Sequence, residues 1–138
     1  NKNNMCIIFH GQRFTIKNAR TNQPILTGNK QDFRKLIVQN KRHLAEADLI
    51  GADLQALNLC GANLKRASLM NALLQGTNLS HSNLQNANLD KADLWLVDLR
   101  GANLKNANLR DSHCENVIID ASQKDDLLRA LGVIVKPE

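Results

Sequence analysis

A leucine returns at every fifth position from Leu44 to Leu109, and Cys114 and Ile119 extend the series. We call each residue of this series the centre of a five-residue unit. Two residues before each centre lies a small or modest side chain, most often Ala, and the position directly before the centre is usually Asn or Asp. A period of five fits neither regular element. Residues five apart point about 140° apart around an α-helix, and in a strand they fall on opposite faces. The pattern instead predicts that five residues advance the chain along one short side and around one corner.

Four such sides close a square coil of 20 residues, so that residues 42–121 make four coils. Backbone pairing between stacked coils would space them by about 4.8 Å, and the leucines would bury one continuous core. The sequence therefore predicts an all-β solenoid. The period disfavours the alternative of an Ala/Leu-rich helical solenoid.

The segment before the repeat, residues 1–41, carries the signals of ordinary elements. Residues 1–4 are expected to form a disordered tail, and three short strands are predicted over residues 5–10, 13–17 and 24–27. A helix should follow, with Asn29 as its N-cap, a stripe of Phe33, Leu36 and Ile37, and Asn40 as its stop. Because a first coil leaves its core and strand edges open, this segment is expected to cap the solenoid.

The last segment, residues 122–138, should close the opposite end. Ser122 is the expected cap of a helix over residues 123–131, with Leu127, Leu128 and Leu131 facing the last coil and Gly132 ending the helix. A terminal strand is predicted at residues 133–135. This strand would pair either with its own coil or with a second copy of the chain.

Three of the five-residue units show the repeat most clearly: Ala47-Asp48-Leu49-Ile50-Gly51, Ala62-Asn63-Leu64-Lys65-Arg66 and Ala102-Asn103-Leu104-Lys105-Asn106. They resemble the A(D/N)LXX unit of the pentapeptide-repeat family. That resemblance implies a right-handed quadrilateral β-helix, a non-catalytic role in binding other proteins, and a bacterial, particularly cyanobacterial, origin. Because relatives often dimerise through C-terminal elements, it also implies a possible homodimer through the C-terminal segment.

The distribution of charge separates the function classes within such a family. Residues 42–121 carry seven Lys/Arg against nine Asp/Glu, a net charge of −2, whereas residues 1–41 carry eight against one, a net charge of +7. One branch of the family protects DNA gyrase by imitating duplex DNA, which requires a continuous negative face. Here basic residues interrupt the acidic ones and the coil is short, so this role is disfavoured.

Candidate catalytic and metal-binding chemistry is sparse. No nucleophile with a base, glycine-rich phosphate loop or paired-carboxylate motif is evident, so we expect neither an enzyme nor a cofactor. No metal site is expected, since His43, His81 and His113 fall on different sides or coils and His10 lies outside the repeat.

The compartment is predicted from cysteine usage and hydropathy. Three cysteines, Cys6, Cys60 and Cys114, form no disulfide framework, which favours a reducing, cytoplasmic compartment. No run approaches the roughly 18 apolar residues of a membrane span, so no membrane partner is expected.

Outward positions of the repeat are mostly polar, and the exceptions suggest a partner-binding face. The candidates, on two neighbouring sides, are Ile50, Met70, Leu73, Trp95 and Leu96. Exposed apolar surface with a Trp at its edge is typical of sites where partner proteins dock. The alternative is that a terminal segment folds over these residues and hides them.

Nucleic-acid binding through the basic first segment is the second functional hypothesis. Its candidate residues are Arg13, Lys17, Arg20, Lys30, Arg34, Lys35 and Lys41, with Phe9 or Phe14 as stacking groups. These charges would otherwise be ordinary solvated surface residues.

Overall fold

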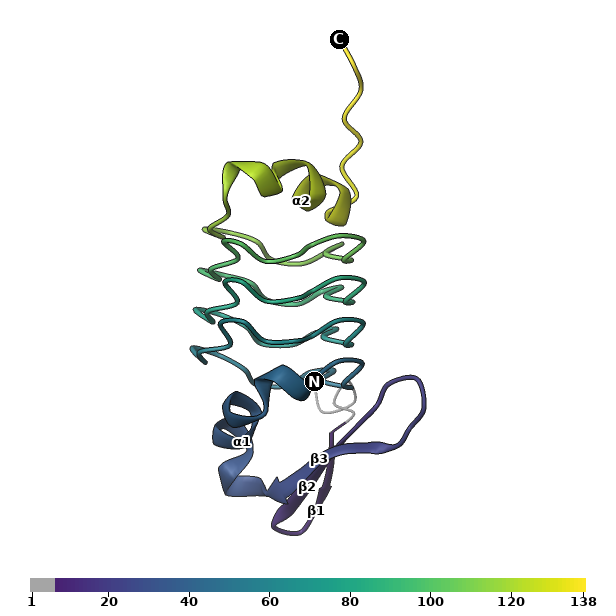
Figure 1. Cartoon of the computed structure of the whole chain (residues 1–138), viewed down its shortest axis with the longest axis vertical. Coiled ribbons are helices and arrows are strands. Elements are labelled where there is room, and N and C mark those ends of the chain that lie inside the picture. The colour runs from purple at the N-terminus through teal and green to yellow at the C-terminus, as the bar shows by residue number, and fades with distance from the viewer. Residues whose placement is uncertain (1–6) are drawn as a thin grey trace.

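The computed structural model describes residues 7–138 as a stack of coils with an α/β segment at one end and a helix at the other (Figure 1). Before the coils lie β1 (Ile8–His10), β2 (Arg13–Lys17), β3 (Pro24–Asn29), the 3-10 turn η2 (Lys30–Asp32), α1 (Phe33–Gln39) and η3 (Lys41–His43). After them lie η4 (Ala121–Gln123) and α2 (Lys124–Ala130). No helix within residues 7–138 is long and apolar enough to cross a membrane.

The coils contain 20 residues each, as the period predicts. Parallel bridges join residues 20 apart, for example Asp48 to Ser68, Ser68 to Asn88 and Asn88 to Asn108. The N–H groups of the centres from Leu49 to Leu99 donate to the next coil, as Leu49 N does to Ser68 O at 2.8 Å. Consecutive coils are therefore held together by backbone hydrogen bonds, which saturate the polar groups that a narrow coil would otherwise leave unpaired.

Each corner of the coil is a tight turn that uses a left-handed residue. Ala52 N donates to Leu49 O at 3.0 Å, and the residue two places after the centre, Gly51, has φ 70°. A positive φ at the third turn position defines a type II turn, which Gly and Asn tolerate best. This explains why those residue types recur after the centres: Gly at 51, 61, 76 and 101, and Asn at 71, 86, 106 and 116.

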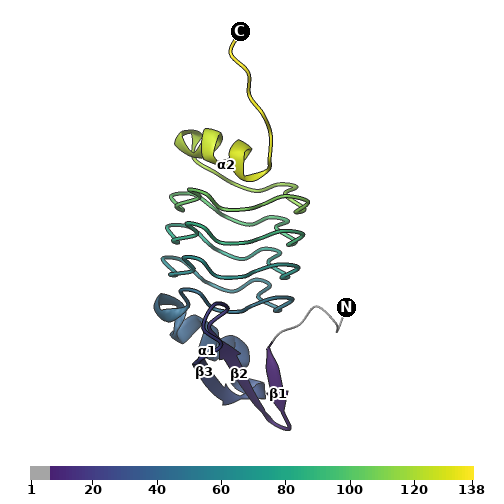
Figure 2. The same cartoon turned by 90° about the vertical axis from the view of Figure 1, so that its right-hand side faces the viewer.

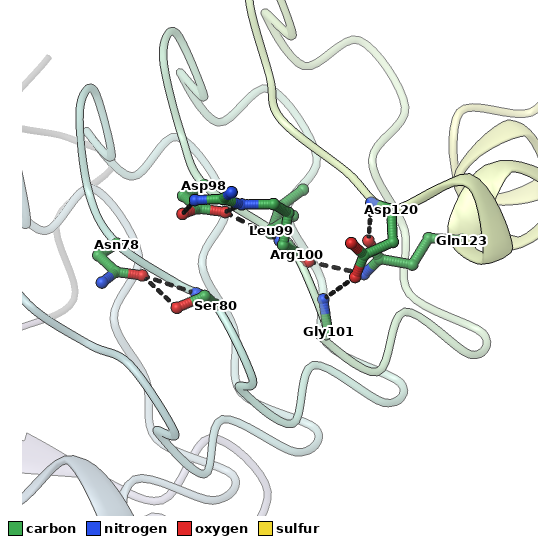
Figure 3. Close-up of polar contacts among 8 residues, drawn as sticks. All are labelled: Asn78, Ser80, Asp98, Leu99, Arg100, Gly101, Asp120 and Gln123. Atoms are coloured by element: carbon green, nitrogen blue, oxygen red, sulfur yellow. Dashed lines mark hydrogen bonds and ion pairs between the residues drawn. The ribbon is translucent and has the colours of Figure 1, made fainter.

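The Asn or Asp before each centre closes a second local bond. Its side-chain oxygen accepts the N–H one place after the centre, as Asn78 Oδ1 does from Ser80 N at 2.9 Å and Asp98 Oδ1 from Arg100 N at 3.0 Å (Figure 3). Eleven units make this bond. The polar position of the repeat is thus an Asx turn that stabilises the corner.

The interior is filled by the centres and by the small residues two places before them. The leucine centres from Leu44 to Leu109 are at most 2% exposed, and Ala occupies most of the small positions with similar burial. The burial predicted for the centres is confirmed through Leu109, and that predicted for the small positions is confirmed except at Leu57, which is only partly buried. Beyond Leu109, Cys114 and Ile119 are only partly buried, because no further coil covers them.

The first segment packs on the open end of the coil. β2 pairs antiparallel with β1 and β3, Asp48 N donates to Lys17 O at 2.8 Å, and the rings of Phe14 and Phe33 meet edge to face at 5.0 Å. The predicted stop at Asn40 is confirmed. Asn29, the predicted cap, makes no capping bond, because its Oδ1 accepts from the Arg13 guanidinium at 3.3 Å. The predicted tail at 1–4, the first residues of the predicted first strand and Cys6 lie outside the described residues.

Glu46 joins this segment to the coil. Its Oε2 accepts from Asn18 Nδ2 at 2.8 Å and from the Arg20 guanidinium at 3.3 Å, and its Oε1 lies 3.8 Å from the Arg66 guanidinium. The Asn18 hydrogen bond and, less strongly, the two arginines hold the pKa of the Glu46 carboxyl below its usual range.

At the far end, α2 begins differently from the prediction. The helical segment starts with η4, whose cap is Asp120 rather than Ser122, and α2 follows directly. Asp120 N donates to Gln123 Oε1 at 2.7 Å in a capping box. Gln123 is buried and its Nε2 donates to Leu99 O at 2.6 Å, while Asp120 Oδ2 accepts from Gly101 N at 2.8 Å (Figure 3). These contacts tie the start of the helix to the preceding coil, which selects Asp120 as the cap.

The chain leaves the coil after α2. Gly132, with φ 78°, ends the helix as predicted, and Val133 N donates to Leu128 O at 2.9 Å in a Schellman arrangement. The prediction that residues 133–135 form a strand on their own coil is wrong, since these residues extend away from the coil (Figures 1 and 2) and Ile134 is 82% exposed. Their β propensity is not realised because they pair with no strand in residues 7–138. Pairing with a second copy stays a prediction.

We expect Leu84→Ala to destabilise the fold by about 2–5 kcal/mol, because it leaves a cavity in a central coil. Gln85→Ala, on the outer surface of the same coil, should change the free energy of unfolding by no more than about 0.5 kcal/mol. Chemical denaturation of both variants measures this difference. Equal losses would contradict the observed register.

The contact of Glu46 with the first segment should depend on pH. Because its pKa is lowered on folding, its stabilisation is present above the unfolded-state pKa and is lost as the pH falls through that value and the lower folded-state one. Glu46→Gln should remove this part of the acid dependence measured by denaturation between neutral and acidic pH. If the free energy of unfolding of Glu46→Gln falls at acidic pH as much as that of the wild type, the Glu46 carboxylate does not contribute to the pH dependence of stability.

Candidate functional site

One side of the square coil carries most of the exposed apolar residues of the repeat. We call it the Trp95 side, and it consists of residues 53–56, 73–76, 93–96 and 113–116. On it Leu73 is 38% exposed, Trp95 41% and Leu96 43%. Leu73 bridges to Asp93, and Gly76 N donates to Trp95 O at 2.8 Å. These contacts place Leu73 one coil from Trp95 and Leu96 on the same side, and no segment of residues 7–138 covers them.

Leu73 and Leu96 each replace a residue type that the coil geometry favours. Leu73 stands at the Asx-turn position, where it has no oxygen to accept the Gln75 N–H. Leu96 has φ 59°, and it is the only large apolar side chain among the left-handed residues of the described chain. A left-handed backbone costs a residue with a Cβ about 1–2 kcal/mol. The fold alone therefore does not account for leucine at these positions.

Ile118 belongs to the same group but was missed by sequence reasoning. It also occupies an Asx-turn position, it stacks on Asp98 of the adjoining side, and it is 45% exposed. The signal that could have found it is the apolar residue directly before the Ile119 centre, the same signal that marks Leu73 before Leu74.

Ile50 and Met70 lie on the other adjoining side. Gly51 N donates to Met70 O at 2.9 Å, so the two residues stack in neighbouring coils as predicted. Both are half-buried. The exposed apolar surface is therefore centred on Leu73, Trp95 and Leu96 rather than spread equally over both sides.

Polar groups around Trp95 are mainly acidic. Asp93 Oδ1 accepts Trp95 N at 3.2 Å, and the His113 ring lies between two carboxylates, with Nδ1 3.2 Å from Asp93 Oδ1 and Nε2 3.2 Å from Glu115 Oε2. Below Trp95, Gln75 Nε2 donates to Asp93 Oδ2 at 2.7 Å, whereas Gln75 Oε1 is buried without a hydrogen-bond partner.

The lower end of the Trp95 side meets the first segment. Arg34 of α1 donates to Asp53 O at 3.2 Å, to Asp53 Oδ1 at 3.4 Å and to Gln55 O. An open pocket of about 240 Å³ lies at this junction and is lined by Phe9, Lys30, Gln31, Phe33, Arg34 and Asp53. The apolar surface and this pocket are thus neighbours, joined through Asp53, which bridges to Leu73.

The basic residues of the first segment are spread over several elements. Arg13 and Lys17 lie on β2, Arg34 and Lys35 on α1, Arg20 in the turn after β2, and Lys41 at the start of η3. Arg20 and Arg34 form ion pairs with Glu46 and Asp53.

The proposed stacking groups are not available as such. Phe14 is fully buried, so its prediction as a stacking group is wrong, and the Lys30 ammonium covers Phe9 at 5.2 Å from the ring centroid. This segment therefore presents no ready aromatic platform for bases.

Metal-ligating side chains and thiols are the remaining reactive groups of residues 7–138. No cluster of three His, Cys, Asp or Glu side chains is close enough to hold a metal ion in this part of the chain. Cys60 and Cys114 are free thiols, and burial raises the pKa of the Cys114 thiol, which opposes formation of a reactive thiolate.

Leu96→Asn should raise the free energy of unfolding by about 0.5–1 kcal/mol, because Asn tolerates the left-handed backbone better than Leu. The reverse change at an equivalent corner, Asn86→Leu, should lower it by a similar amount. Thermal and chemical denaturation of the two variants test this pair. A destabilised Leu96→Asn variant would mean that Leu96 contributes to packing within the chain.

Comparison with known proteins agrees with this geometry. A family model described as pentapeptide repeats matches residues 47–86 and 77–113, with 8 copies of the repeat. A search of curated proteins returned no match.

Three solved structures are similar to the chain. HetL, a pentapeptide repeat protein involved in heterocyst differentiation regulation from the cyanobacterium Nostoc sp. strain PCC 7120, is 37% identical with a TM-score of 0.54, over 55% of this chain and 35% of HetL. The pentapeptide repeat protein alr5209 from Nostoc PCC 7120 is 36% identical with a TM-score of 0.59, over 62% of this chain and 71% of alr5209. AT2G44920, from the Arabidopsis thaliana thylakoid lumen, is 24% identical with a TM-score of 0.45, over 64% and 66%.

The chain thus spans about a third of the length of HetL but most of the length of alr5209. The repeat, the 20-residue coils and the similarity to alr5209 lead to one conclusion. The chain belongs to the pentapeptide-repeat family, whose fold is the right-handed quadrilateral β-helix.

Proposed function

We propose that this protein is a non-catalytic scaffold that binds a partner protein through the Trp95 side. The observation that carries the proposal is the exposure of Leu73, Trp95 and Leu96 at outward positions that the repeat mostly fills with polar residues or Gly. Leucine at two of these positions gives up an Asx turn or strains a corner. Residues that oppose local stability in this way are typical of functional sites.

The physical properties of the side suit protein recognition. The backbone ladder holds its side chains at fixed spacing, so that little conformational freedom remains to be lost on binding. Trp is enriched among the residues that dominate binding energy at interfaces, and here the only Trp of the chain stands beside two exposed leucines. Ile118, around the adjoining corner, would extend the contact.

The similarity to HetL supports a binding role over a catalytic one, since HetL is involved in the regulation of differentiation. Only 35% of HetL is covered, so the shared feature is the repeat itself. A cytoplasmic location and a cyanobacterial source remain parts of the proposal. The unpaired thiols of Cys60 and Cys114 and the two Nostoc relatives support them.

Association of two copies through the C-terminal segment also stays a proposal. The exposed apolar residues Val133, Ile134 and Val135 are the support for it. Removal of residues 133–138 would convert such a dimer to a monomer, which analytical ultracentrifugation would detect as a halved molar mass. The same oligomeric state before and after the removal would exclude this contact.

The two nucleic-acid hypotheses gain no support from the geometry. The coil lacks a continuous acidic face, which disfavours imitation of DNA. Lys and Arg residues interrupt the acids on three sides, and on the Trp95 side the exposed Leu73, Trp95 and Leu96 lie between the acids. The first segment keeps exposed cations such as Arg13 and Lys35 but uses Arg20 and Arg34 in ion pairs. A salt-dependent electrophoretic shift with generic DNA and RNA would support direct nucleic-acid binding by the first segment.

The test is a double substitution that makes the side polar without harming the fold. Leu73→Asn with Leu96→Asn supplies the residue types that the coil prefers. The free energy of unfolding of this variant should therefore lie within about 1 kcal/mol of that of the wild type. Partners captured from an extract of the native host should bind it about 2 kcal/mol more weakly, a loss of roughly thirtyfold. Trp95→Ala should have a similar effect on binding.

The matched control is Lys91→Asn with Lys105→Asn, which introduces the same residue at two exposed positions outside the Trp95 side. It should retain every partner. If the Leu73 and Leu96 variant is folded and still binds all partners with wild-type affinity, the Trp95 side is not the binding surface.

A further inference from the structure

The charge of the Trp95 side differs from that of the rest of the coil. Its coil residues include the three acids Asp53, Asp93 and Glu115, but no Lys or Arg. All six Lys and Arg residues between Leu44 and Ile119 lie elsewhere on the coil. On the adjoining side, by contrast, the Arg100 guanidinium binds Asp98 at 2.8 Å and holds the pKa of that carboxyl below its usual range. Carboxylates therefore surround the exposed leucines and Trp95 without a basic residue of the coil to pair with them.

Two groups of this chain already show how the side binds nitrogen-bearing groups. The Arg34 guanidinium reaches it from α1, where it contacts the Asp53 carboxylate and two backbone carbonyl oxygens. The imidazole of His113 lies between Asp93 and Glu115, with one ring nitrogen 3.2 Å from each carboxylate. Both arrangements use a planar, nitrogen-bearing group, which matches carboxylate oxygens well.

The acids that remain accessible flank the apolar residues. The side chain of Glu115 is 67% exposed and that of Asp53 56% exposed, whereas that of Asp93 is 31% exposed and both of its carboxylate oxygens already have partners. The contacts that Asp53 makes with Gln55 and Arg34 all use its Oδ1. Asp53 lies one coil before Leu73, and Glu115 one coil after Trp95. A partner segment that covers the leucines and Trp95 would thus meet a carboxylate at each end.

We propose that the partner of the Trp95 side is a cationic protein segment, in which apolar side chains that pack on Leu73, Trp95 and Leu96 are flanked by Arg or Lys residues that pair with Asp53 and Glu115. This inference rests on the proposed function, and it adds the chemistry of the partner. An acidic segment would bury its carboxylates against those of this side without compensation, which is unfavourable. A neutral apolar segment would desolvate Asp53 and Glu115 without supplying any further partner for them.

A display library of random peptides is the probe for the composition of the partner. Immobilised wild-type protein should enrich peptides that combine Leu, Phe or Trp with Arg or Lys, and these should not bind the Leu73→Asn/Leu96→Asn variant. Trp95 is the only Trp of the chain, so the binding of an enriched peptide that lacks Trp should change the fluorescence emission of Trp95. That change places the peptide on this side.

Charge variants then test the ionic part separately. Asp53→Asn with Glu115→Gln should weaken an enriched peptide by about fivefold for each charge removed, and high salt should reduce the wild-type affinity toward that of the variant. Asp48→Asn with Asp90→Asn removes the same charge from an adjoining side and should leave the affinity within about twofold of the wild type. Asn at 48 and at 53 retains the oxygen that accepts the Asx-turn hydrogen bond.

The outcomes separate the two proposals. Peptides that require Leu73 and Leu96 but are acidic or neutral, or that bind the Asp53→Asn/Glu115→Gln variant as tightly as the wild type, overturn the cationic partner and leave the proposed function in place. Equal weakening by the Asp48→Asn/Asp90→Asn control also overturns it, because the effect would then reflect net charge alone. Failure to enrich any peptide that depends on Leu73 and Leu96 overturns both.

Discussion

The coil depends on one backbone requirement, which is that the residue two places after each centre adopts a left-handed conformation. That residue turns the corner and also donates its N–H to the next coil, as Gly51 does to Met70 O at 2.9 Å. If it did not turn, successive leucines would no longer return to the interior, and the ladder that joins residues 20 apart would lose its register. The sequence repeat is therefore a repeat of corners as much as of core residues.

The two ends of the ladder present different orphan groups, and the chain meets them with side chains of opposite charge. At the first coil Asp53 O and Gln55 O have no preceding coil to pair with, and the Arg34 guanidinium donates to both. At the far end the following coil stops at Asp120, and Gly101 N donates to the Asp120 carboxylate at 2.8 Å, where the earlier corners donate to a backbone carbonyl. A cation at the carbonyl edge and an anion at the N–H edge satisfy backbone groups that would otherwise leave the stack open.

Sequence reasoning could predict what depends on the period and failed where a side chain must find a distant backbone atom. The five-residue period was sufficient for the 20-residue coil, the buried leucines and the exposure of Trp95, because each follows from the register of a single unit. Asp120 displaced Ser122 as a cap because Gln123 reaches Leu99 O, a contact that needs the fold to be known. Phe14 was misread as a surface group for the same reason, since Phe33 meets it only after α1 has docked.

The departures from the repeat are more informative than the repeat, because the corner geometry supplies a standard against which each outward residue can be judged. Asn and Asp at the Asx-turn position are accounted for by the hydrogen bond that their side-chain oxygen accepts from the backbone. Their abundance therefore says nothing about function. Leu73 and Ile118 give up that bond, and Leu96 occupies a conformation that suits Gly or Asn. Because three such exceptions lie on one side and its adjoining corner around the only Trp, selection for a surface accounts for them better than chance variation in a tolerant repeat.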